Sequence, residues 1–287
     1  MNNIKMKGQI IKIISDNYYV KSHHKIYICK ARGRFRKDNI KPLVGDLVLI
    51  DIEKKYIIDI LPRHNELTRP SIANVDQAMI LISVKEPNLA LDLLDKMLII
   101  IQHHNIKPII CFTKLDLLTK MEKQFIRNLI NYYRKLGYLV FTNQQLFWLK
   151  RIFKNKITVL AGQSGVGKST LLNKLNKDLN LSTKPISLAL GRGKHTTKHV
   201  KLLEVSNGLI ADTPGFSAVN LTNITNEAIR DNFIEFHQYK KRCQYRNCFH
   251  LNEVNCEVKK MVQKGKILES RYQNYQCFIK SKEGNHD

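Results

Sequence analysis

The sequence lacks the long apolar segments of a membrane protein. No run reaches the roughly 18 consecutive apolar residues that a membrane-spanning helix needs. The first residues also lack the apolar stretch of a signal peptide. We therefore expect a cytoplasmic protein with no membrane partner, and a monomer by default. Internal repeats are lacking too, and the length of 287 residues favours about two or three domains.

Acidic residues are scarce. The chain has 24 Asp and Glu against 48 Lys and Arg, so its formal net charge is +24, and the excess extends over its whole length. Compositional drift toward Lys, Asn and Ile is one explanation. We favour a polyanionic partner, namely nucleic acid, because drift does not readily explain the Arg-containing cluster at residues 30–37.

Cysteine is infrequent, and half of the six cysteines are scattered. The scattered ones are expected to be reduced thiols: Cys29, Cys111 and Cys277. The other three lie close together, which in a cytosolic chain indicates a metal site rather than disulfides.

The clustered cysteines form the pattern Cys243-x4-Cys248-x-His250-x5-Cys256. Three thiolates and one imidazole make a complete tetrahedral ligand set with no open position, which predicts a structural zinc ion. His237 is the less favoured fourth ligand, because His250 lies inside the cluster, and free thiols in a helical tail are the alternative. Nearby basic residues suggest that this region also faces RNA phosphates: Lys240, Lys241, Arg242 and Arg246.

The first sixty residues resemble a small all-β barrel. Five short strands are expected: Gly8–Ile14, Tyr18–Val20, Lys25–Cys29, Leu47–Asp51 and Tyr56–Ile60. This density of strands favours an OB-fold, a fold that commonly binds oligonucleotides, although such a barrel can also serve only to pack on its neighbour. Residues 62–70, bounded by prolines, are expected to be a linker.

From residue 74 to about residue 220, apolar strands alternate with helical patterns. The expected strands are Ala78–Val84, Pro108–Phe112, Tyr138–Phe141, Ile157–Ala161, Val200–Val205 and Leu209–Ala211. The expected helices are Leu89–His104, Glu122–Leu136 and Lys168–Asn176. This alternation predicts an α/β domain with a parallel sheet, and a mainly helical domain follows it. The predicted boundaries are 1–66 for the barrel, 67–221 for the α/β domain and 222–287 for the zinc domain.

A phosphate-binding loop lies between one of these strands and the next helix. The residues expected to contact nucleotide are Gly162, Gln163, Ser164, Gly165, Val166, Gly167, Lys168, Ser169 and Thr170. The glycines let backbone N–H groups converge on phosphate oxygens. We expect Lys168 to reach the β- and γ-phosphates and the Ser169 hydroxyl to bind Mg²⁺.

A second loop predicts recognition of guanine. Thr113, Lys114, Leu115 and Asp116 follow a buried strand and are similar to the Asn-Lys-x-Asp motif of GTPases. The Asp116 carboxylate is expected to accept hydrogen bonds from two guanine N–H groups, which adenine cannot supply. The Lys114 stem is expected to lie along the base, and the Thr113 hydroxyl to anchor the loop in place of the usual Asn.

Asp212-Thr213-Pro214-Gly215 follows another apolar strand and matches the Asp-x-x-Gly motif that senses the γ-phosphate. Asp212 is expected to hold Mg²⁺, and the backbone N–H of Gly215 is expected to meet the phosphate. Ras-like enzymes place a Gln next, to orient the attacking water, but this chain has Phe216.

A basic stretch upstream, residues 191–198, occupies the position of a switch. Thr197 is the first candidate for the Mg²⁺-binding threonine of this switch, and Thr196 is the second. His195 could place or activate water, and the alternative is a solvated side chain on a basic loop.

The order of these motifs is unusual, because the base loop precedes the phosphate loop. With the barrel and the Cys/His cluster, this order resembles the RsgA family of circularly permuted GTPases over essentially the whole chain. Such a permutation is tolerable because domain termini often lie close together. The resemblance implies GTP hydrolysis stimulated by the small ribosomal subunit, a role late in the maturation of that subunit, contact with its rRNA, and a need for His195. Every residue carried over matches the family pattern except Thr113.

Two other functions remain open at this point. A P-loop ATPase or small-molecule kinase would bind ATP as tightly as GTP, and Asp116 argues against it. A plain RNA-binding module with a vestigial nucleotide site would release no phosphate from GTP.

Overall fold

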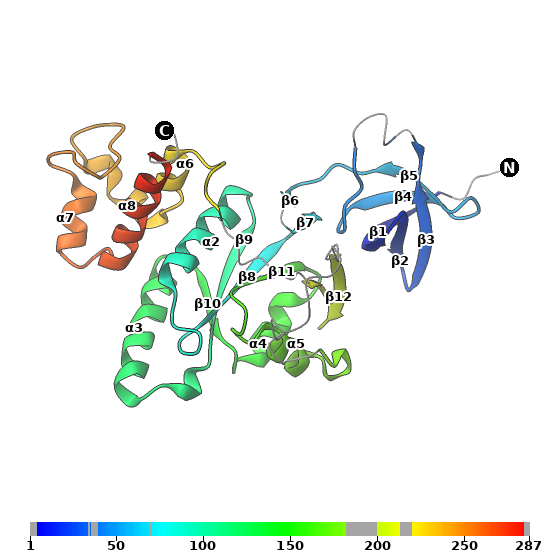
Figure 1. Ribbon diagram of the computed structural model, residues 1–287, viewed down its shortest axis with the longest axis horizontal. Coiled ribbons are helices and arrows are strands. Elements are labelled where there is room, and N and C mark those ends of the chain that lie inside the picture. The colour runs from blue at the N-terminus through cyan, green and yellow to red at the C-terminus, as the bar shows by residue number, and fades with distance from the viewer. Residues whose placement is uncertain are drawn as a thin grey trace, which may run out of the picture.

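A barrel, a layered α/β unit and a helical unit follow one another along the chain in the computed structural model (Figure 1). The structure describes residues 5–33, 35, 40–68, 70–181, 200–212 and 220–283. No helix in these ranges is long and apolar enough to cross a membrane.

The N-terminal barrel closes through five strands. They are β1 (Lys5–Ile14), β2 (Asn17–Ser22), β3 (Lys25–Ala31), β4 (Leu47–Asp51) and β5 (Tyr56–Ile60). Their order is β1-β2-β3-β5-β4, and pairing of β1 with β4 closes the ring. Only β3 and β5 run parallel among these pairs. Ile10, Val20 and Ile50 fill the interior. The OB-like barrel is thereby confirmed.

The predicted linker, residues 62–70, connects the barrel to the sheet and contains regular structure. Strand β6 (Glu66–Thr68) lies within it and forms a hairpin with β7 (Ser71–Ala73), which follows it. Leu67 and Ile72 of this hairpin are buried in the core that joins barrel and sheet. The Asn65 side chain both donates to and accepts from the backbone of Val75, each over 2.8 Å. Buried side chains and these bonds make the connection a structured joint.

The α/β unit contains a six-stranded sheet. Its strands are β8 (Gln77–Ser83), β9 (Lys107–Thr113), β10 (Leu139–Thr142), β11 (Ile157–Ala161), β12 (Lys201–Val205) and β13 (Gly208–Asp212). The order is β10-β9-β8-β11-β13-β12. The first five are parallel, as expected, and β12 is antiparallel to β13. Strand β12 also pairs with β1 of the barrel, so one continuous sheet runs through both units.

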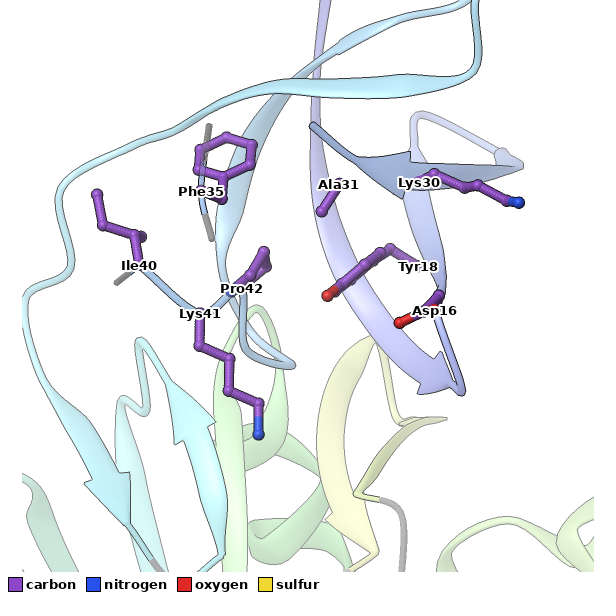
Figure 2. A pocket seen from close by; sticks show the side chains of 8 residues that line it. All are labelled: Asp16, Tyr18, Lys30, Ala31, Phe35, Ile40, Lys41 and Pro42. Carbon is purple, nitrogen blue, oxygen red and sulfur yellow. The ribbon is translucent and has the colours of Figure 1, made fainter. Parts of the chain in front are cut away.

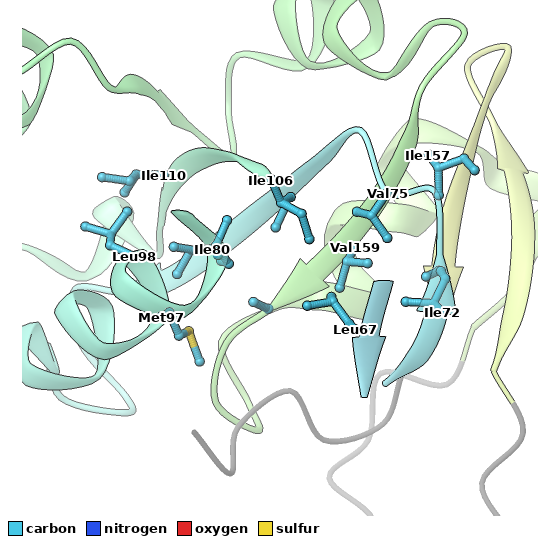
Figure 3. Close-up of a cluster of buried hydrophobic side chains, with 14 of the residues drawn as sticks. Leu67, Ile72, Val75, Ile80, Met97, Leu98, Ile106, Ile110, Ile157 and Val159 are labelled. Carbon is cyan, nitrogen blue, oxygen red and sulfur yellow. The ribbon is translucent and has the colours of Figure 1, made fainter. Parts of the chain in front are cut away.

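Helices cover both faces of this sheet. They are α2 (Leu91–His103), α3 (Lys120–Lys135), α4 (Leu146–Phe153) and α5 (Lys168–Leu175). Alternate residues of a strand point to opposite faces. Ile80 therefore packs in one core with Met97 and Leu98 of α2 (Figure 3), and this core also includes side chains of α3. Met79 packs with α4 and α5 in another core.

Local signals explain where α3 begins and ends. Thr119 and Glu122 form a capping box, with the Thr119 N–H donating to Glu122 Oε2 over 2.7 Å. Gly137, with φ of +96°, follows the helix, as the sequence predicts. Helix α4, by contrast, is not predicted by the sequence pattern, because it is only eight residues long and Gln145 at its start makes no side-chain cap hydrogen bond.

The C-terminal unit is mainly helical, as predicted. It contains α6 (Asn226–Asp231), α7 (Glu257–Gln263) and α8 (Glu269–Glu283), with 3-10 turns η3 (Ile234–Gln238) and η4 (Lys240–Arg242). Its core includes Phe233, Phe236 and Tyr275, together with Ile99 from α2.

A buried charge cluster fastens this unit to the α/β unit. Arg271 of α8 pairs with Asp95 of α2 and with Glu235, and all three side chains are at most 2% exposed. Asn274 donates to the second Asp95 oxygen over 2.7 Å. Burial raises the pKa of Asp95 to about 6, against the opposing effect of the Arg271 guanidinium.

Candidate functional site

The base loop and the phosphate loop meet at the carboxyl edge of the sheet. Strand β9 ends at Thr113, β11 ends at Ala161, and β8 lies between them. The carboxyl ends of parallel strands are where open α/β sheets bind ligands. The order of the two loops along the sequence does not affect this arrangement. Which loops are neighbours depends on the spatial order of the strands in the sheet.

Glycines shape the phosphate loop between β11 and α5. Gly162 has φ of +138°, and a Cβ placed on it would lie 2.4 Å from the carbonyl oxygen of Leu81. Gly167 has φ of +96° and caps α5, which begins at Lys168. Both positions therefore need glycine, for close backbone approach at the first and for backbone conformation at the second.

Lys168 folds back over this loop. Its Nζ donates to the carbonyl oxygens of Gly162 and Gln163, over 2.6 and 2.7 Å. Burial lowers the pKa of Lys168, because the charged form loses solvent there. Ser169 is half-buried in the first turn of α5, and Thr170 next to it is exposed. This ammonium is placed where phosphate oxygens could replace the loop carbonyls as its acceptors.

A direct hydrogen bond connects the two loops. The buried Thr113 hydroxyl donates to the carbonyl oxygen of Val166 over 2.8 Å. Val166 is itself 1% exposed, so this carbonyl belongs to the buried part of the phosphate loop. The Thr113 side chain therefore ties the base loop to the phosphate loop.

The remaining base-loop residues turn outward. Lys114 has φ of +60° and begins the 3-10 turn η1 (Leu115–Leu117), and its Nζ donates to the carbonyl of Glu86. Asp116 is exposed on this turn, where a ligand can reach its carboxylate.

Sequence reasoning missed the segment after β8, which contains Glu86 and Pro87. Pro87 lies beside the phosphate loop, 3.9 Å from a Cβ placed on Gly165. The available signal was the carboxyl end of an apolar strand, since the carboxyl ends of the five parallel strands in this sheet lie at the ligand edge.

The structure describes only Asp212 of the residues predicted in the γ-phosphate and switch motifs. Asp212 ends β13 beside the phosphate-loop strand, and its backbone pairs with Lys201. His195, Thr196, Thr197 and Gly215 lie outside the described residues.

The four predicted zinc ligands come together. Their ligand atoms all lie within 4.8 Å of one another: Cys243, Cys248, His250 and Cys256. Cys243 Sγ is 3.9 Å from Cys256 Sγ and 3.6 Å from His250 Nδ1, and the latter two atoms are 3.3 Å apart. A tetrahedral zinc with bonds of about 2.0–2.3 Å needs ligand separations of about 3.6–3.8 Å. The cluster is therefore compatible with zinc. His237 does not belong to this group and instead contacts the Asp231 carbonyl.

The surroundings of the cluster suit a metal. Burial lowers the pKa of His250 to about 4, which leaves the imidazole neutral and able to bind a cation near neutral pH. Tyr272 donates to the His250 carbonyl over 2.7 Å, and the Phe236 ring packs edge-on against the imidazole. These two contacts hold His250 in place as a metal ligand.

The barrel has a cavity of about 520 Å³ on one side (Figure 2). It is lined by Asp16, Tyr18, Lys30, Ala31, Phe35, Ile40, Lys41 and Pro42. Two aromatic rings, two lysines, one carboxylate and apolar side chains thus line a space of ligand size.

Comparison with known proteins decides the family. The description "RsgA GTPase" matches residues 60–222, and "RsgA N-terminal domain" matches residues 7–57. The chain belongs to the RsgA GTPase family. As a member of this family it is a GTP hydrolase that binds guanine nucleotide.

Relatives of this RsgA-family GTPase match it over nearly their full length. Small ribosomal subunit biogenesis GTPase RsgA 1 of Listeria monocytogenes is 47% identical and covers 94% of this chain and 95% of its own. The RsgA of Bacillus cereus is 45% identical, with 95% and 96% covered.

Two crystal structures share the fold. YloQ, described as a circularly permuted GTPase, has a TM-score of 0.84 at 36% identity and covers 100% of this chain and 98% of its own. YjeQ from Thermotoga maritima has a TM-score of 0.84 at 32% identity, with 98% and 99% covered. The predicted family and its permuted order are confirmed.

Proposed function

We propose that this GTPase acts on the small ribosomal subunit and hydrolyses GTP during late maturation of that subunit. The observation that carries the proposal is the similarity, over 94% of the chain, to relatives named for small ribosomal subunit biogenesis. The net charge of +24 supports a partner rich in phosphate.

Within the nucleotide site, we assign the phosphates to the backbone N–H groups of residues 162–170 and to Lys168. The carbonyl contacts of its Nζ support this role, because an ammonium already held at the loop needs little movement to reach a phosphate. The Asp116 carboxylate accepts hydrogen bonds from the guanine edge. The Thr113 hydrogen bond to Val166 holds the base loop, which carries this carboxylate, at a fixed distance from the phosphate loop.

The hydrolytic step falls to the switch and the Asp-x-x-Gly motif. His195 positions or activates the attacking water, and Thr197 belongs to the same switch. The Gly215 N–H senses the γ-phosphate. Phe216 cannot orient water, so His195 is the side chain with suitable chemistry in these two motifs.

Two metal ions complete the proposal. Ser169, Thr197 and Asp212 would hold Mg²⁺, because hydroxyl and carboxylate oxygens are the ligands that this ion prefers. When bound, Mg²⁺ neutralises charge on the β- and γ-phosphates. Zinc would be held by Cys243, Cys248, His250 and Cys256, whose ligand atoms all lie within 4.8 Å of one another.

We assign rRNA contact to the barrel and to the zinc unit. The barrel cavity supports this, since Lys30 and Lys41 can meet phosphate and Tyr18 can meet a base. The family matches at residues 7–57 and 60–222 support unit boundaries at 1–66, 67–221 and 222–287. A monomer in the cytoplasm remains the expected state.

The test is the rate of phosphate release from GTP with and without purified small ribosomal subunits. We expect a faster rate with small subunits, little change with large subunits, and loss of the stimulated rate in His195→Ala. Equal rates with and without small subunits would contradict the proposal.

A further inference from the structure

Helix α4 presents two aromatic side chains to solvent. Its inner face is ordinary, since Leu149 and Phe153 are fully buried against the sheet. On its outer face, Phe147 is 64% exposed and Trp148 is 53% exposed. A solvated helix face normally carries polar residues, so two adjacent exposed rings indicate a contact surface.

The two rings form an ordered group with one cation. Their centroids lie 5.4 Å apart in an edge-to-face arrangement. The Arg151 guanidinium lies 5.7 Å from each ring centroid. We call Phe147, Trp148 and Arg151 the α4 surface. Aromatic faces combined with arginine are the elements with which proteins stack unpaired bases.

The positive charge around this surface favours a polyanionic partner. Residues 123–177 contain no Asp or Glu. Lys150, Arg151 and Lys154 are all exposed, and none has a carboxylate partner within the described ranges. Lys156 is different, because its Nζ lies 3.4 Å from Asp76. A protein partner would need acidic residues to match this field, whereas a nucleic acid supplies phosphates and bases together.

We propose that the α4 surface docks unpaired nucleotides of an RNA, with bases on Phe147 and Trp148 and phosphates on Arg151 and its neighbouring lysines. The RNA as partner class rests on the proposed function. The surface is separate from the barrel cavity, which lies in another unit of the chain.

The test uses the full chain, in which Trp148 is the sole tryptophan and therefore a local fluorescence probe. Titration with short oligouridylate at low salt is expected to quench Trp148, and a fully paired RNA hairpin is expected to quench it much less. Absent quenching by bound oligouridylate, or equal quenching by the hairpin, would overturn the inference.

Variants then separate stacking from general charge. Anisotropy of labelled oligouridylate should show at least about five-fold weaker binding for Phe147→Ala and for Arg151→Gln, which is the low end of base-stacking effects. Phe125→Ala is the matched control, because Phe125 is 58% exposed on α3. An effect no larger than that of Phe125→Ala would overturn the proposal.

Small subunits distinguish this inference from the proposed function. Phe147→Ala should weaken subunit binding and leave the basal rate of GTP hydrolysis unchanged. Subunits that stimulate wild type and Phe147→Ala with equal affinity would overturn the inference and leave the function standing. A photo-crosslinker at position 147 that captures ribosomal protein instead of rRNA would also overturn it. Quenching by oligouridylate without stimulation by subunits would count against the function alone.

Discussion

At the residue scale, the main finding is the Thr113 hydroxyl. The motif comparison left Thr113 as a departure from the usual Asn. The structure shows that this short side chain still spans the gap between the loops, because Val166 brings its carbonyl to 2.8 Å. A hydroxyl donates one hydrogen bond, and here that bond is made to the phosphate loop.

We expect Thr113→Val to weaken GDP binding about three- to ten-fold. The substitution keeps the volume but leaves the buried Val166 carbonyl without this donor, at a cost of about 1 kcal/mol. Titration of a fluorescent GDP analogue measures the effect, and Thr113→Ser should stay near wild type. Equal affinities for Thr113→Val and wild type would show that the bond does not support the site.

Asp116→Asn should exchange the preferred base. The amide can donate where the carboxylate only accepts, so guanine loses its partner and xanthine, which presents an acceptor, gains one. Competition between GTP and XTP for the protein measures the preference. Unchanged preference for GTP would remove Asp116 from the base site.

At the scale of elements, local sequence predicted most strands and helices well. Strands β4, β5 and β11 begin and end where the patterns place them. Two elements escaped prediction for physical reasons. The β6–β7 hairpin is only three residues on each side, so its stability comes from burial of Leu67 and Ile72 in a core made by other segments. Helix α4 has only eight residues and no side-chain cap at its first turn, so the local signals for it are weak.

The Cys/His cluster organises the segment between η4 and α7, which has little apolar core of its own. We expect purified wild-type protein to contain about one zinc per chain. Cys248→Ser should lose most of this zinc and lower the melting temperature, because binding of a structural metal contributes folding free energy. Atomic emission measures the metal.

Cys277→Ser is the control for this experiment, since Cys277 is exposed and outside the cluster. It should retain both the zinc and the melting temperature. Zinc content that is equal in Cys248→Ser and wild type would contradict the ligand assignment.

At the scale of the whole molecule, the three units are joined by different means. Backbone pairing of β1 with β12 and the ordered hairpin hold the barrel to the sheet. Arg271, buried between two carboxylates, holds the C-terminal unit to α2. Helix α2 follows the segment whose Glu86 carbonyl accepts from Lys114 of the base loop, and its Ile99 packs in the core of the C-terminal unit, so α2 lies between the nucleotide site and the zinc unit.

Arg271→Met should lower the free energy of unfolding by about 3–5 kcal/mol, because Asp95 and Glu235 would remain buried without their counter-ion. Adding Asp95→Asn and Glu235→Gln should recover much of this loss, since no net charge is then left buried. Urea denaturation measures both. Arg127→Met, on the exposed face of α3, should change stability by less than about 0.5 kcal/mol. A loss no larger than this control would show that the cluster does not hold the units together.

Residue type and spacing alone predict the phosphate loop, the base loop and the Cys/His cluster, because each motif is a short segment whose function depends on local geometry. The family matches support the GTPase chemistry that these motifs predict. Tertiary structure alone decided how these parts are joined. The contact of Thr113 with Val166 and the pairing of Asp95 with Arg271 connect residues that are far apart in the chain. Such contacts depend on strand order and helix packing, and no local pattern encodes them.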